Sequence, residues 1–534
     1  MTGTQRSLHA LNRLGFGPRP GDLEAVQRVG VERYVAQQLS PESIPEPGDL
    51  TRRVASLHTL RMTPVELFVE FQQPVRDADK DDPDARKMAH REARQVMMEA
   101  VEARIVRAVY GVRHLHEVMA AFWFNHFNVF AGKGLCSIWS GAFEEEAIRP
   151  HAMGRFRDLL GATAKHPAML FYLDNWQNTA PNSPGTHGKF DGINENYARE
   201  LMELHTLGVN GGYTQNDVIA LAHILTGWGL VKPGGQMRAP PNFPAQNFWM
   251  RPGGFFGPFA FRRMRNPNNP ARANGLIGQY GFFFHGNRHD SAEQSILGRT
   301  IPAGGIEQGE YALDLLARNP ATAKHISYQF AQYFVADDPP SALVERMANR
   351  YLASDGNIRE VLAAMFTSSE FWDRRYYNNS KFKTPYEYVI SSVRATGAPL
   401  INVLPLAGTM SQMGMPLYGC QTPDGYKNTR EAWLNPDAMM LRLSFATALG
   451  AGRLPLDRRP DDDSAGRAGL GKAGRLRPIN FDGKPKFKMD PPDPAELAMT
   501  LGDQFSPRTA EAVESAPAQL RAPLILGSPE FMLR

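Results

Sequence analysis

Apolar side chains recur every three or four positions along most of the chain, which is the spacing of one face of an α-helix. No run of alternating apolar and polar residues indicates a set of β-strands. The sequence therefore predicts an all-α fold, a large array of helices with long irregular loops and few or no strands. The predicted helices cover residues 22–39, 64–71, 83–110, 114–130, 141–164, 193–207, 214–228, 307–318, 320–335, 340–353, 357–368, 384–396, 436–450, 494–502 and 507–525.

Two stretches interrupt the helical pattern. Residues 232–290 are rich in Gly, Pro, Asn and aromatic side chains, and residues 453–493 are rich in Pro, Gly and charged side chains. A loop as long as the first packs through its own side chains or serves a function, and the second is typical of a flexible linker. We therefore predict a main helical domain over 1–452 with an insertion at 232–290, a linker over 453–493, and C-terminal helices over 494–534 that dock on the main domain.

Composition and short motifs exclude several classes of protein. The net charge is only +4, and Lys and Arg are interspersed with Asp and Glu, so the chain lacks the basic stripe of a nucleic-acid-binding protein. No apolar run is long enough to span a membrane, and the N-terminus has no apolar segment of a secretion signal. The chain has no GxSxG, HExxH or P-loop motif, which argues against the common serine hydrolases, zinc proteases and nucleotide-dependent enzymes. The chain has two cysteines, Cys136 and Cys420, so the sequence allows one disulfide bridge but does not predict it.

The predicted helix 193–207 has one polar face and one apolar face. At 100° per residue its polar side chains fall within an arc of about 140°. One interpretation is a solvated face of ion pairs, each worth about 0.2–0.5 kcal/mol. The other is a site, because acid–base hydrolysis needs one carboxyl that holds a proton beside one that is ionised, and because carboxylates also bind metal ions. The polar face consists of Glu195, Asn196, Arg199, Glu200 and Glu203.

The predicted helix 114–130 is apolar on nearly every side, which predicts that it is buried. Asn125 and His126 are then polar groups in the interior, and each must find a partner or cost about 1–3 kcal/mol. A structural hydrogen-bond network and a role in a site are both open for this pair. His205, by contrast, is expected to be a hydrogen-bonded histidine of the core.

The remaining candidates lie in loops. Asp174 and Asn175 follow the apolar run AMLFYL and either cap it or line a pocket. His289 and Asp290 supply metal ligands or a base, or Asp290 only caps the next helix. Aromatic side chains of the insertion either stack on sugar rings or pack the loop onto the body. These are Phe243, Trp249, Phe255 and Phe259.

Several segments resemble a bacterial family catalogued as domain of unknown function 1800. They include LNRLGFGP at 11–18, FWFNHFNVF at 122–130, HPAMLFYLDNWQN at 166–178, NENYAREL with its continuation at 194–228, RHD at 288–290, LARNPATAKHISYQFAQYFVADDPP at 316–340, KTPYEYV at 383–389 and CQTPDGYKNT at 420–429. The resemblance covers nearly the whole chain. It implies a bacterial source and a periplasmic or extracellular location, but it supplies no reaction. The chain departs from the pattern at Cys136, where an Asp is expected, and at Gln294, where a Lys often follows the His-Asp pair.

These observations lead to one hypothesis and two alternatives. The hypothesis is a hydrolase that acts on a glycan or another extracytoplasmic polymer, or on a small molecule, with Glu200 and Glu203 as its carboxylates. Arg199 would orient a carboxylate or the substrate, and His126 would be an acid–base group or support one. One alternative adds a divalent metal ion held by His289 and Asp290, and the other is a non-catalytic binding or scaffolding protein. The predicted substrate-binding residues are Asn125, Asp174, Asn175, Glu195, Asn196 and Trp228.

Overall fold

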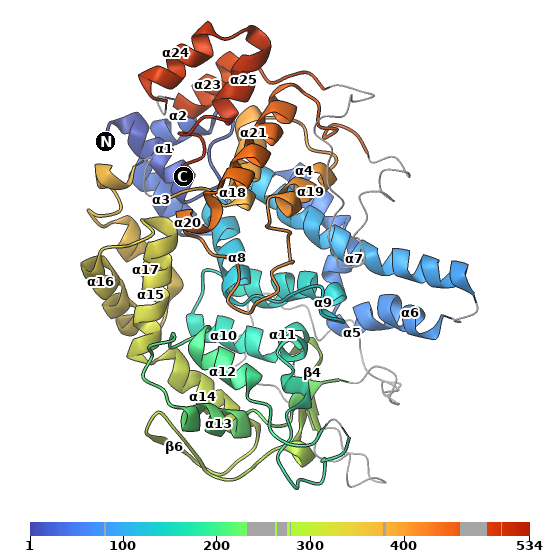
Figure 1. Cartoon of the computed structure of the whole chain (residues 1–534). Helices are drawn as coiled ribbons and strands as arrows, with labels where there is room; N and C mark the ends of the chain where they lie inside the picture. The colour runs from blue at the N-terminus through green and yellow to red at the C-terminus, as the bar shows by residue number, and fades with distance from the viewer. Residues whose placement is uncertain are drawn as a thin grey trace.

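The computed structural model describes residues 1–78, 82–188, 190–231, 262–263, 275–277, 279–377, 381–459, 489–502 and 505–534. Helices make up most of these residues, and the strands are short, so the all-α prediction is confirmed (Figure 1). The first half of the chain contains α1 (Gly3–Arg13), α2 (Asp22–Val29), α3 (Val31–Gln38), α4 (Gly48–Ala55), α5 (Pro64–Leu67), α6 (Gln73–Asp77), α7 (Pro83–Tyr110), α8 (His114–His126), α9 (Cys136–Phe143), α10 (Phe156–Lys165), α11 (Pro167–Tyr172), α12 (Asn196–Glu203) and α13 (Gln215–Ile224).

The second half begins with two small antiparallel sheets and continues as helices. One sheet has the strand order β1-β4-β3-β2, and the other pairs β5 with β6. The strands are β1 (Trp228–Leu230), β2 (Arg262–Arg263), β3 (Gly275–Ile277), β4 (Phe282–His285), β5 (Gln294–Ile296) and β6 (Arg299–Ile301). The helices that follow are α14 (Ile306–Ala317), α15 (Pro320–Phe334), α16 (Ser341–Ala353), α17 (Ile358–Phe366), α18 (Pro385–Thr396), α19 (Leu404–Gln412), α20 (Arg430–Trp433), α21 (Pro436–Gly450), α23 (Pro494–Leu501), α24 (Pro507–Ser515) and α25 (Ala518–Leu526).

Three of the predicted helices are wrong as continuous elements, and a backbone cause is visible in each. The prediction over 22–39 divides at Gly30, whose φ of +86° does not belong to a right-handed helix. The prediction over 141–164 divides into α9, a π-helical turn at Glu144–Ile148, a 3₁₀ turn at Arg149–His151 and α10, because Pro150 lacks an N–H donor. The prediction over 507–525 divides at Pro517 into α24 and α25.

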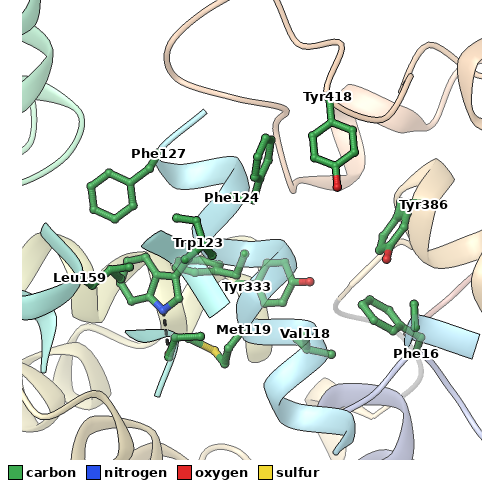
Figure 2. Packing of buried hydrophobic residues seen from close by; sticks show 14 of the residues in the cluster. Phe16, Val118, Met119, Trp123, Phe124, Phe127, Leu159, Tyr333, Tyr386 and Tyr418 are labelled. Carbon is green, nitrogen blue, oxygen red and sulfur yellow. Dashed lines mark hydrogen bonds between the residues drawn. The ribbon is translucent and has the colours of Figure 1, made fainter. Parts of the chain in front are cut away.

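Helix α8 lies in the hydrophobic core, as its apolar surface predicts. Figure 2 shows its aromatic side chains meeting those of neighbouring elements. Trp123 is fully buried, and its indole N–H donates to the backbone oxygen of Ala152 at 3.0 Å. Phe124 meets the ring of Tyr418 edge-on, with 4.9 Å between centroids. The rigid surroundings of α8 therefore fix the positions of the polar groups at its C-terminal end.

The C-terminal helices pack on the body of the protein. Helix α25 contacts α21, and α23 contacts α18 and α2, so the end of the chain lies beside its beginning (Figure 1). The last residue of the sequence, Arg534, is buried and its backbone N–H donates to Lys381 O at 2.9 Å. The division into domains remains a prediction. Most of the predicted linker lies outside the described residues, as do Phe243, Trp249, Phe255 and Phe259 of the insertion.

Candidate functional site

A cavity of about 360 Å³ lies between α8, α12, α15, α18 and the segment 415–429. We call it the Glu203 cavity. Its wall contains three carboxylates, those of Glu203, Glu387 and Asp424, and two side chains that are always or usually cationic, Arg104 and Lys427. Its other polar or aromatic lining residues include Asn125, His126, Asn128, His325, Gln329, Gln332, Tyr333, Thr384, Tyr386, Tyr418, Tyr426, Asn428 and Thr429.

Asn125, at the end of α8, fastens the segment 415–429 to the core. Its Nδ2 donates to Tyr426 O at 2.8 Å, and its Oδ1 accepts from the Tyr426 N–H at 2.8 Å. Gly425 lies against the same residue, with a φ of +68°. A Cβ at Gly425 would come within 2.2 Å of the Asn125 backbone oxygen. The close approach of this segment to α8 therefore requires glycine.

We expect Gly425→Ala to lower the free energy of unfolding by about 2–4 kcal/mol, as the sum of left-handed strain and overpacking. Gly414→Ala is a matched control, because Gly414 also has a positive φ but has open space where its Cβ would lie. The control should cost about 1–2 kcal/mol. Urea unfolding of both variants measures the difference, and equal losses would show that the contact with Asn125 is not tight.

Two histidines of the cavity wall, His126 and His325, lie beside a third, His205, which does not line the cavity. The His126 ring lies 6.1 Å from that of His205 and 6.5 Å from that of His325, measured between centroids. Burial lowers the pKa of His126 well below its usual value, and the neighbouring His205 and His325 lower it further. Burial also lowers the pKa of His205 to about 3. The rings are therefore neutral at pH 7, and a neutral imidazole is a proton acceptor.

His126 itself has a partner on one side. Its Nε2 lies 3.1 Å from the backbone oxygen of His205, so this nitrogen carries the proton and donates. Buried His205, expected to be a hydrogen-bonded core histidine, has an Nε2 that meets no hydrogen-bond partner among the described residues. The predicted hydrogen bond of His205 is therefore wrong, although His205 lies in the core as predicted.

The polar face of α12 divides into an outer and an inner part. The Arg199 guanidinium donates to Glu195 Oε2 at 2.9 Å and to Gln215 Oε1 at 3.0 Å, on the partly exposed side of the helix. Asn196 is exposed, and its Nδ2 donates to Leu173 O at 3.2 Å. Glu195 and Arg199 thus form a solvated ion pair, as in the first interpretation, and neither they nor Asn196 line the Glu203 cavity.

The inner part of the face is Glu203; Glu200 lies one turn earlier and is not among the residues that line the cavity. Glu203 lines the cavity, and the Tyr213 hydroxyl donates to its Oε2 at 3.0 Å. Burial raises the pKa of Glu200, and the charges of Glu203 and Asp424 raise it further, against the opposing effect of Arg199. A carboxyl whose pKa is raised beside a second carboxylate can hold a proton while its neighbour is ionised.

The predicted residues Asp174, Asn175 and Trp228 lie elsewhere, and Asn175 holds the turn before β1. Asp174 has a φ of +61° and accepts from Lys133 Nζ at 2.8 Å. Asn175 is fully buried, and its Nδ2 donates to the backbone oxygens of Leu225 at 3.2 Å and Trp228 at 3.0 Å. Trp228 is fully buried as well. None of the three lines the Glu203 cavity.

The predicted metal pair is also separate from this cavity. His289 Nδ1 lies 2.9 Å from Thr226 O, and its Nε2 lies 3.0 Å from Gln308 Oε1, so both ring nitrogens face hydrogen-bond acceptors. Asp290 Oδ2 pairs with His223 Nδ1 at 2.7 Å. Among the residues that the structure describes, no three His, Cys, Asp or Glu side chains are arranged to hold a metal ion. These residues do not fit a metal centre.

Many residues of the cavity carried no role in the sequence-based hypothesis, and two of them are titratable groups close to the predicted ones. His325 comes from α15, and Asp424 comes from the segment 415–429. Both lie inside segments that resemble the family, 316–340 and 420–429, and that resemblance was the only signal available. Cys136 and Cys420, for which a bridge was open, are both free and buried.

The chain belongs to the family described as protein of unknown function (DUF1800), which it matches over residues 9–533. Comparison with curated proteins and with solved structures finds no match. Within the described part of the chain, no helix is both long and apolar enough to cross a membrane.

Proposed function

We propose that this protein is a hydrolase whose acid–base groups lie in the Glu203 cavity. One observation carries the proposal: Glu203 of the NENYAREL segment shares this cavity with Asn125 and His126 of the FNHF segment. The two segments lie about eighty positions apart in the sequence, and each was a separate candidate. A concave pocket with convergent titratable groups is the default position of an active site.

The proposed roles follow from the surroundings of each group. Glu203, held by the Tyr213 hydroxyl, is the base that takes a proton from an attacking water. Glu200 favours the protonated form but does not line the cavity, so its proposed part is to supply a proton through Glu203, one turn later on the same helix. His126 is neutral and supports proton transfer at the cavity wall. Arg199 keeps no direct role, because it binds Glu195 and Gln215.

The lining of the cavity favours a substrate rich in hydroxyl or amide groups. Tyr386, Tyr418 and Tyr426 line the cavity with aromatic rings, and Gln329 adds an amide to the carboxylates. Aromatic faces combined with carboxylates and amides suit a sugar ring, whose apolar faces stack and whose hydroxyls form hydrogen bonds. A glycan is therefore the first substrate class to test.

The test is a rate measurement with p-nitrophenyl glycosides, p-nitrophenyl esters and amino-acid p-nitroanilides. We expect turnover of at least one class, and Glu203→Gln should lower kcat by about 10²–10⁴-fold, because the amide cannot accept a proton. Glu195→Gln is the matched control: it makes the same change on the same helix, outside the cavity, and its kcat should stay within about threefold of the parent.

Thermal unfolding of both variants shows whether the fold survives. A Glu203→Gln variant that is folded and as active as the parent would overturn the proposal. So would an absence of turnover in all three classes, which would favour a non-catalytic binding protein with a polar core.

A further inference from the structure

A second and larger cavity, of about 980 Å³, runs along α7. We call it the α7 groove. Helices α6 and α7 lie side by side where they extend from the body, and the groove is lined from both (Figure 1). Its other walls are the segment 130–137, the end of α19 and the segment 416–421. Its volume lies at the upper end of the range for small-molecule sites.

One stripe of α7 forms the long wall of this groove. The stripe residues are spaced by three, four and one positions, so they lie on one face of the helix. The stripe spans about 16 Å at 1.5 Å per residue. Its first part is exposed and charged, and its later part, with Met97 only 6% exposed, is buried and apolar. The stripe consists of His90, Ala93, Arg94, Met97, Met98 and Val101.

The charges of the two cavities differ in sign. No Asp or Glu is among the described residues that line the α7 groove, whereas three carboxylates line the Glu203 cavity. Arg94 is exposed and forms no ion pair with a described residue, and His90 lies one turn before it. The groove therefore has one cationic end and one apolar end.

We propose that the α7 groove binds a single-chain amphiphile with an anionic headgroup, of the fatty-acid class. The carboxylate pairs with Arg94, and the acyl chain lies over Met97, Met98 and Val101. Methionine side chains suit this ligand, because they are flexible and adapt to a chain without a fixed shape. This inference rests on the groove alone and does not depend on the proposed hydrolase activity.

The groove ends at the wall of the Glu203 cavity. Pro416, Leu417, Tyr418 and Tyr426 line both cavities, so one segment of chain separates them. A ligand that fills the apolar end therefore contacts the same residues that shape the candidate active site.

The test is isothermal titration calorimetry of the full chain with dodecanoate and with dodecyltrimethylammonium, both below their micelle concentrations. We expect dodecanoate to bind with a Kd in the micromolar range and the cation, which has the same tail, to bind at least about tenfold more weakly. Arg94→Glu should weaken dodecanoate binding by about tenfold or more and reverse the preference. Arg91→Glu makes the same charge change at an exposed position that does not line the groove, and should leave binding within about twofold.

A second variant tests whether the groove itself holds the ligand. Ala93 is only partly buried, so Ala93→Trp fills the groove with little effect on the core, and it should abolish dodecanoate binding while the melting curve stays cooperative. Equal binding of the anion and the cation, equal effects of Arg94→Glu and Arg91→Glu, unchanged binding by folded Ala93→Trp, or no binding at all would each overturn the inference.

Discussion

Replacement of Arg534 with alanine is expected to lower the free energy of unfolding by about 3–5 kcal/mol, because it leaves a buried carboxylate without its cation. The Arg534 side chain is 3% exposed and pairs with Glu387, which is 7% exposed. Its guanidinium also donates to Asn12 O at 3.1 Å and to Arg13 O at 2.8 Å, and it lies 4.3 Å from the Tyr333 ring. Guanidinium chloride unfolding measures the loss.

Arg350→Ala is the control for this variant. Arg350 pairs with Glu360 at the surface, where both side chains are more than 40% exposed, and the loss there should be about 0–1 kcal/mol. An equal loss of stability in Arg534→Ala and Arg350→Ala would show that the buried ion pair stabilises the fold no more than the surface ion pair.

The same pair predicts an acid dependence. Burial raises the pKa of the Glu387 carboxyl, but the charge of Arg534, the hydrogen bonds from Thr384 and the charge of Lys381 together outweigh burial and hold that pKa below its usual value. A carboxyl with a lower pKa in the folded than in the unfolded state stabilises the fold above its unfolded pKa of about 4.3, and this contribution is lost as the pH falls through the folded pKa. The difference in stability between the parent and Arg534→Ala should therefore shrink below about pH 4.

Helix positions follow closely from the spacing of apolar residues, because burial of one face decides them. The predicted helix 83–110 corresponds to α7, and the predicted helix 436–450 corresponds to α21. Helix α1 was missed, although Thr2 and Gln5 form a capping box at its start. The divisions at Gly30 and Pro150 were missed because the apolar spacing continues across both, while the backbone cannot.

The candidate site was only partly predictable. Helical geometry placed Glu200 and Glu203 together, and the apolar surface of α8 placed His126 in the interior. Periodicity could not bring Asp424 and His325 to the same cavity, because that depends on how distant segments pack. Nor could it separate Glu195 from Glu203, since the arc of about 140° covers both the solvated ladder and the cavity wall.

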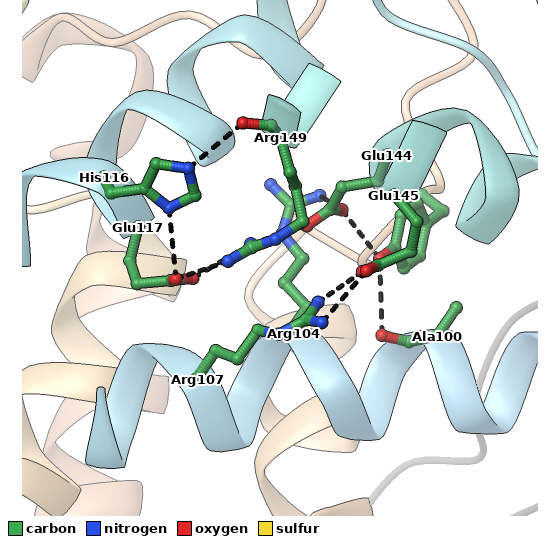
Figure 3. A network of polar contacts seen from close by, with 9 residues as sticks. Ala100, Arg104, Arg107, His116, Glu117, Glu144, Glu145 and Arg149 are labelled. Atoms are coloured by element: carbon green, nitrogen blue, oxygen red, sulfur yellow. Dashed lines mark hydrogen bonds and ion pairs between the residues drawn. The ribbon is translucent and has the colours of Figure 1, made fainter. Parts of the chain in front are cut away.

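Glu144 is the residue whose replacement should have the second large effect on stability. It is 2% exposed, its Oε2 lies 3.2 Å from Arg104 Nη1, and its Oε1 lies 3.6 Å from Arg149 Nη1. The Tyr418 hydroxyl donates to the same Oε2 at 2.8 Å. Figure 3 shows how the charges of this network come from α7, α8 and the successive turns Glu144–Ile148 and Arg149–His151 and face one another. The acidic, basic and histidine side chains labelled there are Arg104, Arg107, His116, Glu117, Glu144, Glu145 and Arg149.

We expect Glu144→Ala to lower the free energy of unfolding by about 3–5 kcal/mol, because Arg104 and Arg149 each lose a carboxylate partner and remain buried and charged. Arg104→Met, which keeps most of the packing, isolates one of the two pairs. The double variant should lose less stability than the sum of the losses in the two single variants, by about 0.5–3 kcal/mol. Each single variant leaves one buried charge without its partner, whereas the double variant removes both charges. Additive losses, measured by urea unfolding of the three variants, would mean that Arg104 and Glu144 act independently. Coupling would mean that Arg104 and Glu144 stabilise the fold as a pair, beside Tyr418, which is one of the residues that line both cavities.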